Sequence, residues 1–435
     1  MRVILVVIAA LGIATLACGD WNEGGVTPTS TAKPLSTSTP AMSAPAMLRP
    51  TVALPIPEWI AANLFGVLEW GQQFIADTVS GEIWELEYSG ERRPSYSGNR
   101  LAAWLPNGEA LVSVTDGSRT TLYRGAPGEP LRQTSTLEFS NSSTVWRSSG
   151  WASNGELLAQ ASGLITDMKT GDIIAELDEP VRTVIGWSAD GRYVAFGVGS
   201  ASERAVLVWE PESGLTERIS TWSAVWSSTG ARLAYGPSFS SLPPNTGPFE
   251  VRVRDFNAGT DTVVNTRDTR ARPVAWSADD RFLANSLYMD SSSTLIIDMT
   301  GERGEVLVPH AEPHAWLGTS HTLLATGDSC EYTAGVSDHV VTVEADGSGL
   351  RRYTDSPLYE LYPRASPDGR LVAFDAPAGP EGPSTIRLLT LATGEITVLA
   401  AGPAITLFEN SIDPALAWSP DGRYVVFGVT EGHDC

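Results

Sequence analysis

The stretch Trp418-Ser-Pro-Asp-Gly-Arg-Tyr-Val-Val-Phe427 is the segment that decides the fold of this chain. A tryptophan precedes a tight turn, Pro-Asp-Gly, and a short apolar run follows it. In such a turn Asp caps the backbone, and Gly accepts the positive φ angle that a side chain resists. The continuous apolar run is typical of a β-strand that is buried on both faces. The segment therefore predicts a hairpin inside a packed β-structure.

The same pattern recurs along the chain. Trp187-Ser-Ala-Asp-Gly-Arg-Tyr-Val-Ala-Phe196 is a close copy, and Ala365-Ser-Pro-Asp-Gly-Arg-Leu-Val-Ala-Phe374 has lost only the tryptophan. The anchor positions of all copies are Trp104, Trp151, Trp187, Trp226, Trp276, Trp316, Ala365 and Trp418. They lie 36 to 53 residues apart, and one four-stranded propeller blade takes about 40–50 residues. We expect the tryptophans to fill the gaps between blades and the clearest turns to use Asp190, Gly191, Asp368, Gly369, Asp421 and Gly422.

A longer stretch identifies the repeat type. Residues Val341-Thr-Val-Glu-Ala-Asp-Gly-Ser-Gly-Leu-Arg-Arg-Tyr-Thr-Asp-Ser356 continue into Ser366-Pro-Asp-Gly-Arg-Leu-Val-Ala-Phe374. This arrangement resembles the TolB-like, WD-repeat-like propeller repeat, and the resemblance extends from about Phe65 to the end of the sequence. It implies an all-β propeller. It is weak for function, because such propellers serve as scaffolds, as binding modules and occasionally as enzyme domains.

The repeat count predicts a single propeller domain over residues 58–435, with eight four-stranded blades. Seven blades is the alternative, if one weak copy is an insertion. The last copy stops after its second strand, while two strand-like segments, 74–79 and 82–88, precede the first anchor. We expect these early strands to complete the last blade, because closing the ring removes exposed sheet edges.

The first 57 residues predict export and a tether. Met1-Arg2, an apolar run and a small residue before Cys18 describe a signal peptide over residues 1–17. The junction resembles a bacterial lipoprotein processing site, which implies that Cys18 carries a lipid; simple cleavage after Ala17 is the alternative. Residues 18–57 are rich in Thr, Ser and Pro, which predicts a disordered spacer. These features place a membrane-anchored lipoprotein on the periplasmic or cell-surface side.

Charge and motifs narrow the function. The formal net charge of −22 disfavours nucleic acid, because an acidic surface repels phosphate. Contact with a membrane is expected only through the lipid anchor, and the protein is expected to be a monomer. The sequence lacks a Gly-x-Ser-x-Gly elbow, a His-Glu-x-x-His motif and a phosphate-binding glycine loop. We therefore expect neither a catalytic residue nor a cofactor.

Cysteines and histidines gather in the second half of the chain. In the predicted blades Cys330 and Cys435 fall in equivalent loops on one face of the propeller. They form a disulfide, which is common outside the cytoplasm, or remain two thiols. The histidines expected on the same face are His310, His314, His339 and His433. Imidazoles are common metal ligands, so these four residues are metal candidates, with solvent-exposed loop histidines as the alternative.

Two functions from different classes follow. The first is a non-catalytic binding or scaffold propeller outside the cytoplasm, which contacts an unidentified envelope protein or glycan at the cell envelope. The second is a metal-dependent carbohydrate-active enzyme, since some polysaccharide lyases use a propeller with a histidine-coordinated metal. A bound transition metal on the histidine-bearing face distinguishes the second from the first.

Overall fold

The computed structural model describes residues 72–85, 100–138, 149–160, 163–199, 204–237, 248–287, 293–327, 339–354, 360–377, 384–402 and 416–429, apart from 106, 117–118, 152–156, 168–171, 178, 180 and 222. All of them belong to one compact unit, Leu48–Cys435, the other being Met1–Met47. The signal segment, the tether and the predicted sites at Cys18, Cys330, His433 and Cys435 lie outside the described residues. Within these ranges no helix has the length and apolar character needed to span a membrane.

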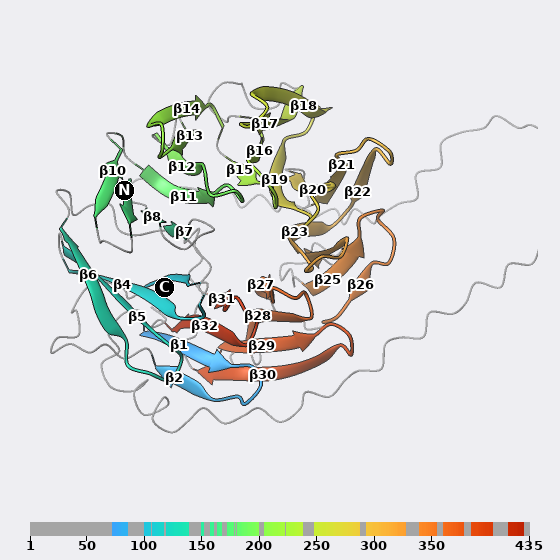
Figure 1. Ribbon diagram of the computed structural model, residues 1–435. Helices are drawn as coiled ribbons and strands as arrows, with labels where there is room; N and C mark the ends of the chain where they lie inside the picture. The colour runs from blue at the N-terminus through green and yellow to red at the C-terminus, as the bar shows by residue number, and fades with distance from the viewer. Residues whose placement is uncertain are drawn as a thin grey trace, which may run out of the picture. The chain divides into compact units, whose positions relative to one another are not determined.

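The described residues form eight antiparallel sheets of four strands each (Figure 1). The following sentences give each sheet from its innermost strand outwards. One sheet contains β3 (Arg100–Trp104), β4 (Ala110–Asp116), β5 (Arg119–Gly125) and β6 (Arg132–Glu138). The next contains β7 (Ser149–Trp151), β8 (Leu157–Gln160), β9 (Leu164–Asp167) and β10 (Ile173–Glu176). The third contains β11 (Val181–Trp187), β12 (Val194–Val198), β13 (Ala205–Glu210) and β14 (Leu215–Ile219). The fourth contains β15 (Ala224–Trp226), β16 (Arg232–Tyr235), β17 (Phe249–Asp255) and β18 (Thr260–Arg267).

The remaining four sheets follow the same order. The fifth contains β19 (Ala271–Trp276), β20 (Phe282–Leu287), β21 (Ser293–Asp298) and β22 (Glu305–Val308). The sixth contains β23 (Ala311–Trp316), β24 (Thr322–Gly327), β25 (His339–Glu344) and β26 (Arg351–Arg352). The seventh contains β27 (Leu361–Ala365), β28 (Leu371–Pro377), β29 (Ser384–Thr390) and β30 (Glu395–Gly402). The eighth contains β31 (Leu416–Trp418), β32 (Tyr424–Val429), β1 (Gln72–Asp77) and β2 (Ile83–Glu85).

This arrangement confirms the all-β propeller fold that the repeat predicts. Figure 1 shows the sheets as blades around a common centre, with their first strands innermost. The eighth sheet pairs the earliest described strand with the latest one, in register from Gln72 opposite Val429 to Asp77 opposite Tyr424. At the same junction Trp104 on β3 donates a hydrogen bond to the Ala417 carbonyl on β31, at 3.4 Å.

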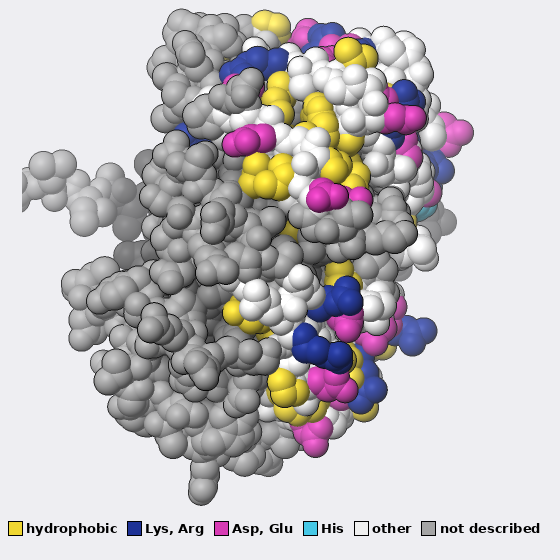
Figure 2. Space-filling view, turned by 60° about the vertical axis from the view of Figure 1, so that its left-hand side comes forward, with side chains coloured by type: hydrophobic (Ala, Val, Ile, Leu, Met, Phe, Trp, Pro, Cys, Tyr) yellow, Lys and Arg dark blue, Asp and Glu magenta, His cyan; other side chains and the backbone are white. Residues whose placement is uncertain are grey.

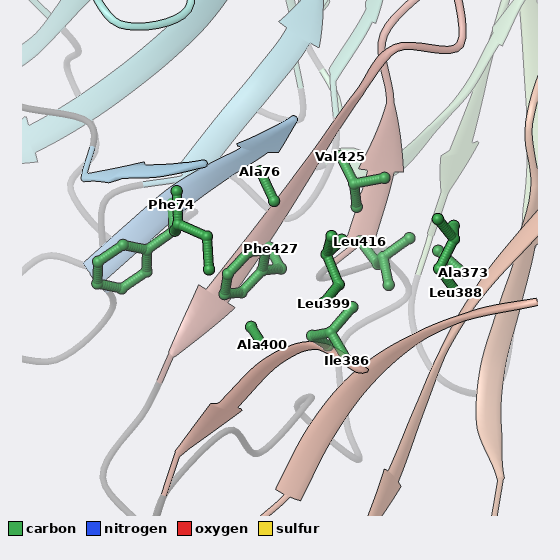
Figure 3. Packing of buried hydrophobic residues seen from close by; sticks show 11 residues of the cluster. Phe74, Ala76, Ala373, Ile386, Leu388, Leu399, Ala400, Leu416, Val425 and Phe427 are labelled. Carbon is green, nitrogen blue, oxygen red and sulfur yellow. The ribbon is translucent and has the colours of Figure 1, made fainter. Parts of the chain in front are cut away.

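The apolar core lies between blades and not inside a single central layer. Strands such as β13, β20 and β21 are buried along their whole length, because neighbouring sheets cover both of their faces. Figure 3 shows one such interface, between the β27–β30 sheet and the sheet that contains β1 and β32. There Phe74 and Phe427 stack with ring centroids 5.7 Å apart, each 2% exposed. Burying one such aromatic ring contributes about 1.5–3 kcal/mol.

The anchor tryptophans link neighbouring blades through a recurring hydrogen bond. Trp276 donates its indole Nε1–H to the carbonyl of Val225, which directly precedes the anchor of the blade before it, at 3.3 Å. The same bond joins Trp226 to Gly186, Trp316 to Ala275, Trp418 to Arg364 and Trp104 to Ala417. Each indole therefore fills space between two blades and also satisfies a carbonyl at the edge of an inner strand.

The turn after each clear anchor is built by its own side chains. Ser419 donates its hydroxyl to Asp421 Oδ1 at 2.5 Å, and that oxygen also accepts from the Arg423 amide at 3.0 Å. Gly422 adopts a φ of 72°, which is the reason for glycine at this position. In the turn after β19 an aspartate, Asp280, takes the glycine position with a φ of 57°.

Candidate functional site

The unusual polar residues gather on three neighbouring inner strands, β19, β23 and β27. In β23 the pairing with β24 shifts between Pro313 and Ala315, so His314 occupies a β-bulge. The same shift occurs in β19 between Pro273 and Ala275, where the bulged residue is Val274. Because a bulge turns a side chain away from the regular pleat, this position presents a group that the strand pattern does not predict.

His314 is neutral at physiological pH. Its Nε2 lies 3.0 Å from the hydroxyl oxygen of Thr326 on β24. Burial of the imidazole lowers the pKa of His314 to about 3, and the positive charges of Arg364 and Arg272 act in the same direction. The imidazole is therefore a neutral hydrogen-bonding group that is surrounded by protein and close to two guanidinium groups.

Arg272 is one of these two cations, and it already has an acidic partner. Its guanidinium donates to Glu312 Oε1 at 2.9 Å, which joins β19 to β23. The second oxygen of Glu312 accepts from the Ser286 hydroxyl at 2.8 Å. The Arg272 Nε is buried and has no hydrogen-bond partner. The pair is therefore compensated in charge, with one donor left over.

Arg364 has no acidic partner among the described residues. It directly precedes Ala365, the anchor that lacks tryptophan, and its backbone carbonyl accepts the indole hydrogen bond of Trp418. The Arg364 Nε is buried without a hydrogen-bond partner, and its guanidinium forms no ion pair with any other described residue. Burial of the guanidinium lowers the pKa of Arg364. The residue as a whole is partly exposed.

Arginines elsewhere in the described residues are commonly paired. Figure 2 shows basic and acidic side chains interspersed on the face it presents, not separated by sign. The described pairs include Arg192–Glu210, Arg218–Glu179, Arg232–Asp280, Arg254–Glu217, Arg267–Glu305, Arg281–Asp298 and Arg423–Asp77. Arg364 thus differs from these paired arginines, in a protein whose net charge of −22 offers an excess of carboxylates.

A second polar cluster lies between the sixth and seventh blades. Glu360, just before β27, is 1% exposed. Its Oε2 accepts hydrogen bonds from the Thr354 hydroxyl and from the Val340 amide, the latter at 3.3 Å. Burial raises the pKa of Glu360 to about 7, although these hydrogen bonds and the charges of Arg387 and Arg352 act in the opposite direction. This carboxyl group therefore changes charge near neutral pH.

His339 belongs to the same cluster. Its Nε2 lies 2.5 Å from a guanidinium nitrogen of Arg352, so it is the acceptor and the proton is on Nδ1. Nδ1 lies 3.9 Å from Glu360 Oε2. A buried carboxyl group with a raised pKa beside a histidine is a common feature of functional sites, and structural ion-pair networks show it too.

The histidines predicted as metal candidates do not form a described metal site. His310 lies in the turn before β23 with a φ of 55° and is half-buried. His310 and His339 lie at the same end of the sixth blade, since Ala311 pairs with Gly327 and Gly327 with His339. Among the described residues no group of three His, Cys, Asp or Glu side chains could hold a metal ion.

The sequence reasoning missed three residues of interest. Arg364 was detectable, because the position before the anchor holds Ala103, Gly150, Gly186, Val225, Ala275, Ala315 and Ala417 in the other copies. Glu360 gave no pattern, since it lies outside the repeated motif. His321 gave no pattern either; its Nε2 lies 2.8 Å from Asp279 Oδ2 of the preceding blade, and its ring contacts Phe282 edge-on.

No family model and no curated protein matches this sequence. Solved structures do. Dipeptidyl peptidase 4 from Porphyromonas gingivalis superposes with a TM-score of 0.51 at 10% identity, over 81% of this chain and 62% of that one. A putative TolB from Agrobacterium tumefaciens gives 0.40 at 14% identity, over 84% and 99%. An oligogalacturonate lyase from Vibrio parahaemolyticus gives 0.40 at 13%, over 54% and 67%.

The fold is a β-propeller. The likeness to these structures is one of fold alone, because all identities lie far below the level at which function is shared. This chain also spans only 62% of the peptidase, which is therefore a larger protein than the part it matches. A propeller fold does not by itself decide between an enzyme and a binding protein.

Proposed function

We propose that this protein is a non-catalytic binding propeller that holds a partner protein or a glycan at the cell envelope. The observation that carries the proposal is the gathering of Arg272, His314 and Arg364 on three adjacent inner strands. At the Arg364 position the other copies carry only Ala, Gly or Val. Polar and charged groups that gather on the inner strands of an otherwise repetitive scaffold point to recognition there, since the scaffold itself does not need them.

The chemistry of this site suits binding better than catalysis. His314 stays neutral and Arg272 is neutralised by Glu312, so neither is poised to transfer a proton near neutral pH. The blades that present the groups are linked by tryptophan hydrogen bonds and by apolar interfaces. A rigid scaffold with preset hydrogen-bond donors lowers the entropic cost of binding.

The location belongs to the same proposal. Residues 1–17 have the features of a signal peptide and Cys18 those of a lipid attachment site, followed by a Thr/Ser/Pro-rich tether to residue 57. The propeller is then presented at the membrane surface by a spacer. Expression in a bacterial host with radiolabelled palmitate checks this: the wild type is expected in the membrane fraction with label, and Cys18→Ser without label.

Binding without turnover is tested with the purified full chain on arrays of neutral and acidic oligosaccharides and peptides. We expect reversible capture of at least one ligand class, with the ligand recovered chemically unchanged by mass spectrometry. Arg364→Gln should lose the captured ligand. Arg370→Gln should keep it, because Arg370 is an exposed arginine of the same blade whose side chain is 83% accessible.

The carbohydrate-active enzyme is the outcome that contradicts the proposal. It would be shown by cleavage products in the same arrays, or by a stoichiometric transition metal in the purified protein that is lost in His314→Ala or His310→Ala. Either result would replace a binding role by metal-dependent catalysis on the histidine-bearing blades.

A further inference from the structure

The strongest unexplained feature of the molecule is the Arg364 guanidinium. Its Nε is buried without a hydrogen-bond partner, and no described carboxylate pairs with it. Leaving a cation in a protein interior without a counter-charge costs several kcal/mol, so such groups are normally paired or neutralised. An arginine does not lose its proton in proteins, and an external anion would supply the missing counter-charge.

The neighbours of Arg364 define the charge of that anion. His314 is close enough for the Arg364 charge to depress its protonation, and it is neutral. Arg272 is the other nearby cation, and Glu312 cancels its charge. The site therefore presents a net charge of about one positive unit, with a fixed carboxylate nearby. A monoanion matches this charge, whereas a dianion such as hydrogen phosphate leaves one negative charge uncompensated at the site.

The donors define its shape. A guanidinium presents parallel N–H groups in a planar fork that fits the two oxygens of a carboxylate. The Nε of Arg364 and the Nε of Arg272 are both unused buried donors. Because Arg364 is partly exposed, a ligand can reach it from solvent.

We propose that Arg364, with His314 and Arg272 beside it, forms a binding site for the carboxylate group of a ligand at the inner edge of the propeller. The inference rests on the proposed binding function and names the chemical class that the site recognises. Arg364 is the residue that contacts the ligand, while Glu312 positions Arg272 and sets the net charge of the site.

The experiment is titration of the ¹⁵N-labelled full chain with acetate, phosphate and chloride at matched ionic strength. Two resonances report on the site: the Arg364 Nε–H, and the indole Nε1–H of Trp418, which bonds to the Arg364 carbonyl at 2.9 Å. We expect a saturable acetate-dependent shift of the Arg364 signal in the millimolar range, as one charge-assisted bidentate contact provides. Phosphate and chloride are expected to give no saturable shift.

Variants separate binding from structure. Arg364→Gln should abolish the acetate response at Trp418, and Arg364→Lys should weaken it several-fold, because lysine keeps the charge but loses the fork. Arg370→Gln, the exposed control, should leave the response unchanged. Without acetate, Arg364→Gln should unfold at a higher temperature than the wild type, because it removes an uncompensated charge. Acetate should raise the midpoint of the wild type only.

Several outcomes would overturn the inference. An equal response to acetate, phosphate and chloride would indicate ordinary screening. An unchanged acetate response in Arg364→Gln would place the site elsewhere. No response in the wild type, together with a lower unfolding temperature for Arg364→Gln, would make Arg364 a structural residue. If an array ligand is neutral and still binds, the binding function stands and the carboxylate inference fails.

Discussion

Strands β19 and β23 are nearly the same six residues in two adjacent blades. Ala271-Arg-Pro-Val-Ala-Trp276 and Ala311-Glu-Pro-His-Ala-Trp316 share the burial pattern, the bulge after proline and the indole hydrogen bond to the previous blade. They differ at two positions only. One difference makes the Arg272–Glu312 ion pair, and the other replaces Val274 by His314. The shared residues form the contacts that build each blade. The two positions that differ hold the charged and ionisable side chains.

The two blades also differ in the turn after the first strand and at the start of the third strand. The turn after β19 holds Asp280, which contacts the fourth blade, whereas the turn after β23 holds Gly318, whose backbone lies against the Asp368 carbonyl of the seventh. The third strand begins with Ser293 in the fifth blade and with His339 in the sixth. The two turns therefore contact different neighbouring blades, and the sixth blade carries a histidine at the start of its third strand where the fifth carries a serine.

The largest effect is expected at Asp280, in the turn that follows β19. Its carboxylate is 2% exposed, pairs with Arg232 at 2.7 Å and accepts from the Ser228 amide at 2.6 Å. Asp280→Ala leaves the partly exposed Arg232 and the amides of Ser228 and Thr229 without their acceptor and keeps the strained φ, so we expect a loss of roughly 2–4 kcal/mol. The thermal unfolding midpoint measures it. Asp279→Ala, on a half-exposed neighbour, is the control, and an equal loss there would contradict the assignment.

The titration of Glu360, beside the sixth blade, should make the stability of the protein depend on pH. The pKa of Glu360 is raised from 4.5 to about 7 in the folded protein. The protonated carboxyl group therefore contributes fully to the free energy of unfolding below pH 4.5, and this contribution is lost as pH rises through 7. That contribution is on the order of 3 kcal/mol. His339, Arg352 and Arg387 face the same carboxyl group and temper the effect.

Glu360→Gln should therefore be more stable than the wild type above pH 7 and nearly equal to it below pH 4.5. Unfolding midpoints of both proteins across this range measure the difference. Glu302→Gln, an exposed carboxylate of the fifth blade, is the control and should show no such pH-dependent gain. A constant difference at every pH would show that Glu360 does not titrate in this window.

His314 sharpens the comparison directly, because its counterpart in β19 is valine. The pKa of His314 is lowered from 6.5 to about 3, so the unfolded chain takes up a proton before the folded one does. Stability should fall as pH drops from 6.5 towards 3, by roughly 2–3 kcal/mol over the first two pH units. His314→Val makes β23 resemble β19 and should remove this part of the acid sensitivity. Parallel acid-unfolding curves of variant and wild type would argue against a buried neutral imidazole.

The Arg272–Glu312 pair links the two strands that are compared. Both side chains are partly exposed, so we expect a coupling energy of about 1 kcal/mol in a double-mutant cycle with Arg272→Gln and Glu312→Gln. Exchanging the two residues, with Arg272→Glu and Glu312→Arg, should restore most of this coupling energy. Additive single-mutant losses would show that the pair contributes no net stability.

The smallest effect concerns the feature that the strands share. Trp276→Phe and Trp316→Phe each remove one indole hydrogen bond, to Val225 and to Ala275 respectively, and keep most of the apolar surface. We expect each to cost about 1 kcal/mol. The two losses should be equal within error in thermal unfolding. A clearly larger loss for one of them would show that the blades do not use their anchors in the same way.

The propeller could be predicted from the residues alone because its decisive signals are local and repeated. A tryptophan, a serine-aspartate turn and a glycine with positive φ recur in one order, as at Trp418 and Gly422, and each of these residues works through neighbours in sequence or through an identical neighbouring blade. The sequence predicts strands at 74–79 and 82–88 in the last blade, and there β1 pairs with β32 while β2 pairs with β1. The histidines stay candidates rather than ligands: His314 and His339 contact Thr326 and Arg352.

No such local pattern predicts the charge and protonation states of the polar residues on and beside the inner strands. The lone charge of Arg364, the neutral state of His314 and the raised pKa of Glu360 depend on burial and on partners that belong to other blades. Residues more than 40 positions apart in the chain, such as Arg364 and His314, affect one another only after the blades have packed. Electrostatic free energy depends on distance and on surroundings, which the folded ring sets and the order of the residues does not.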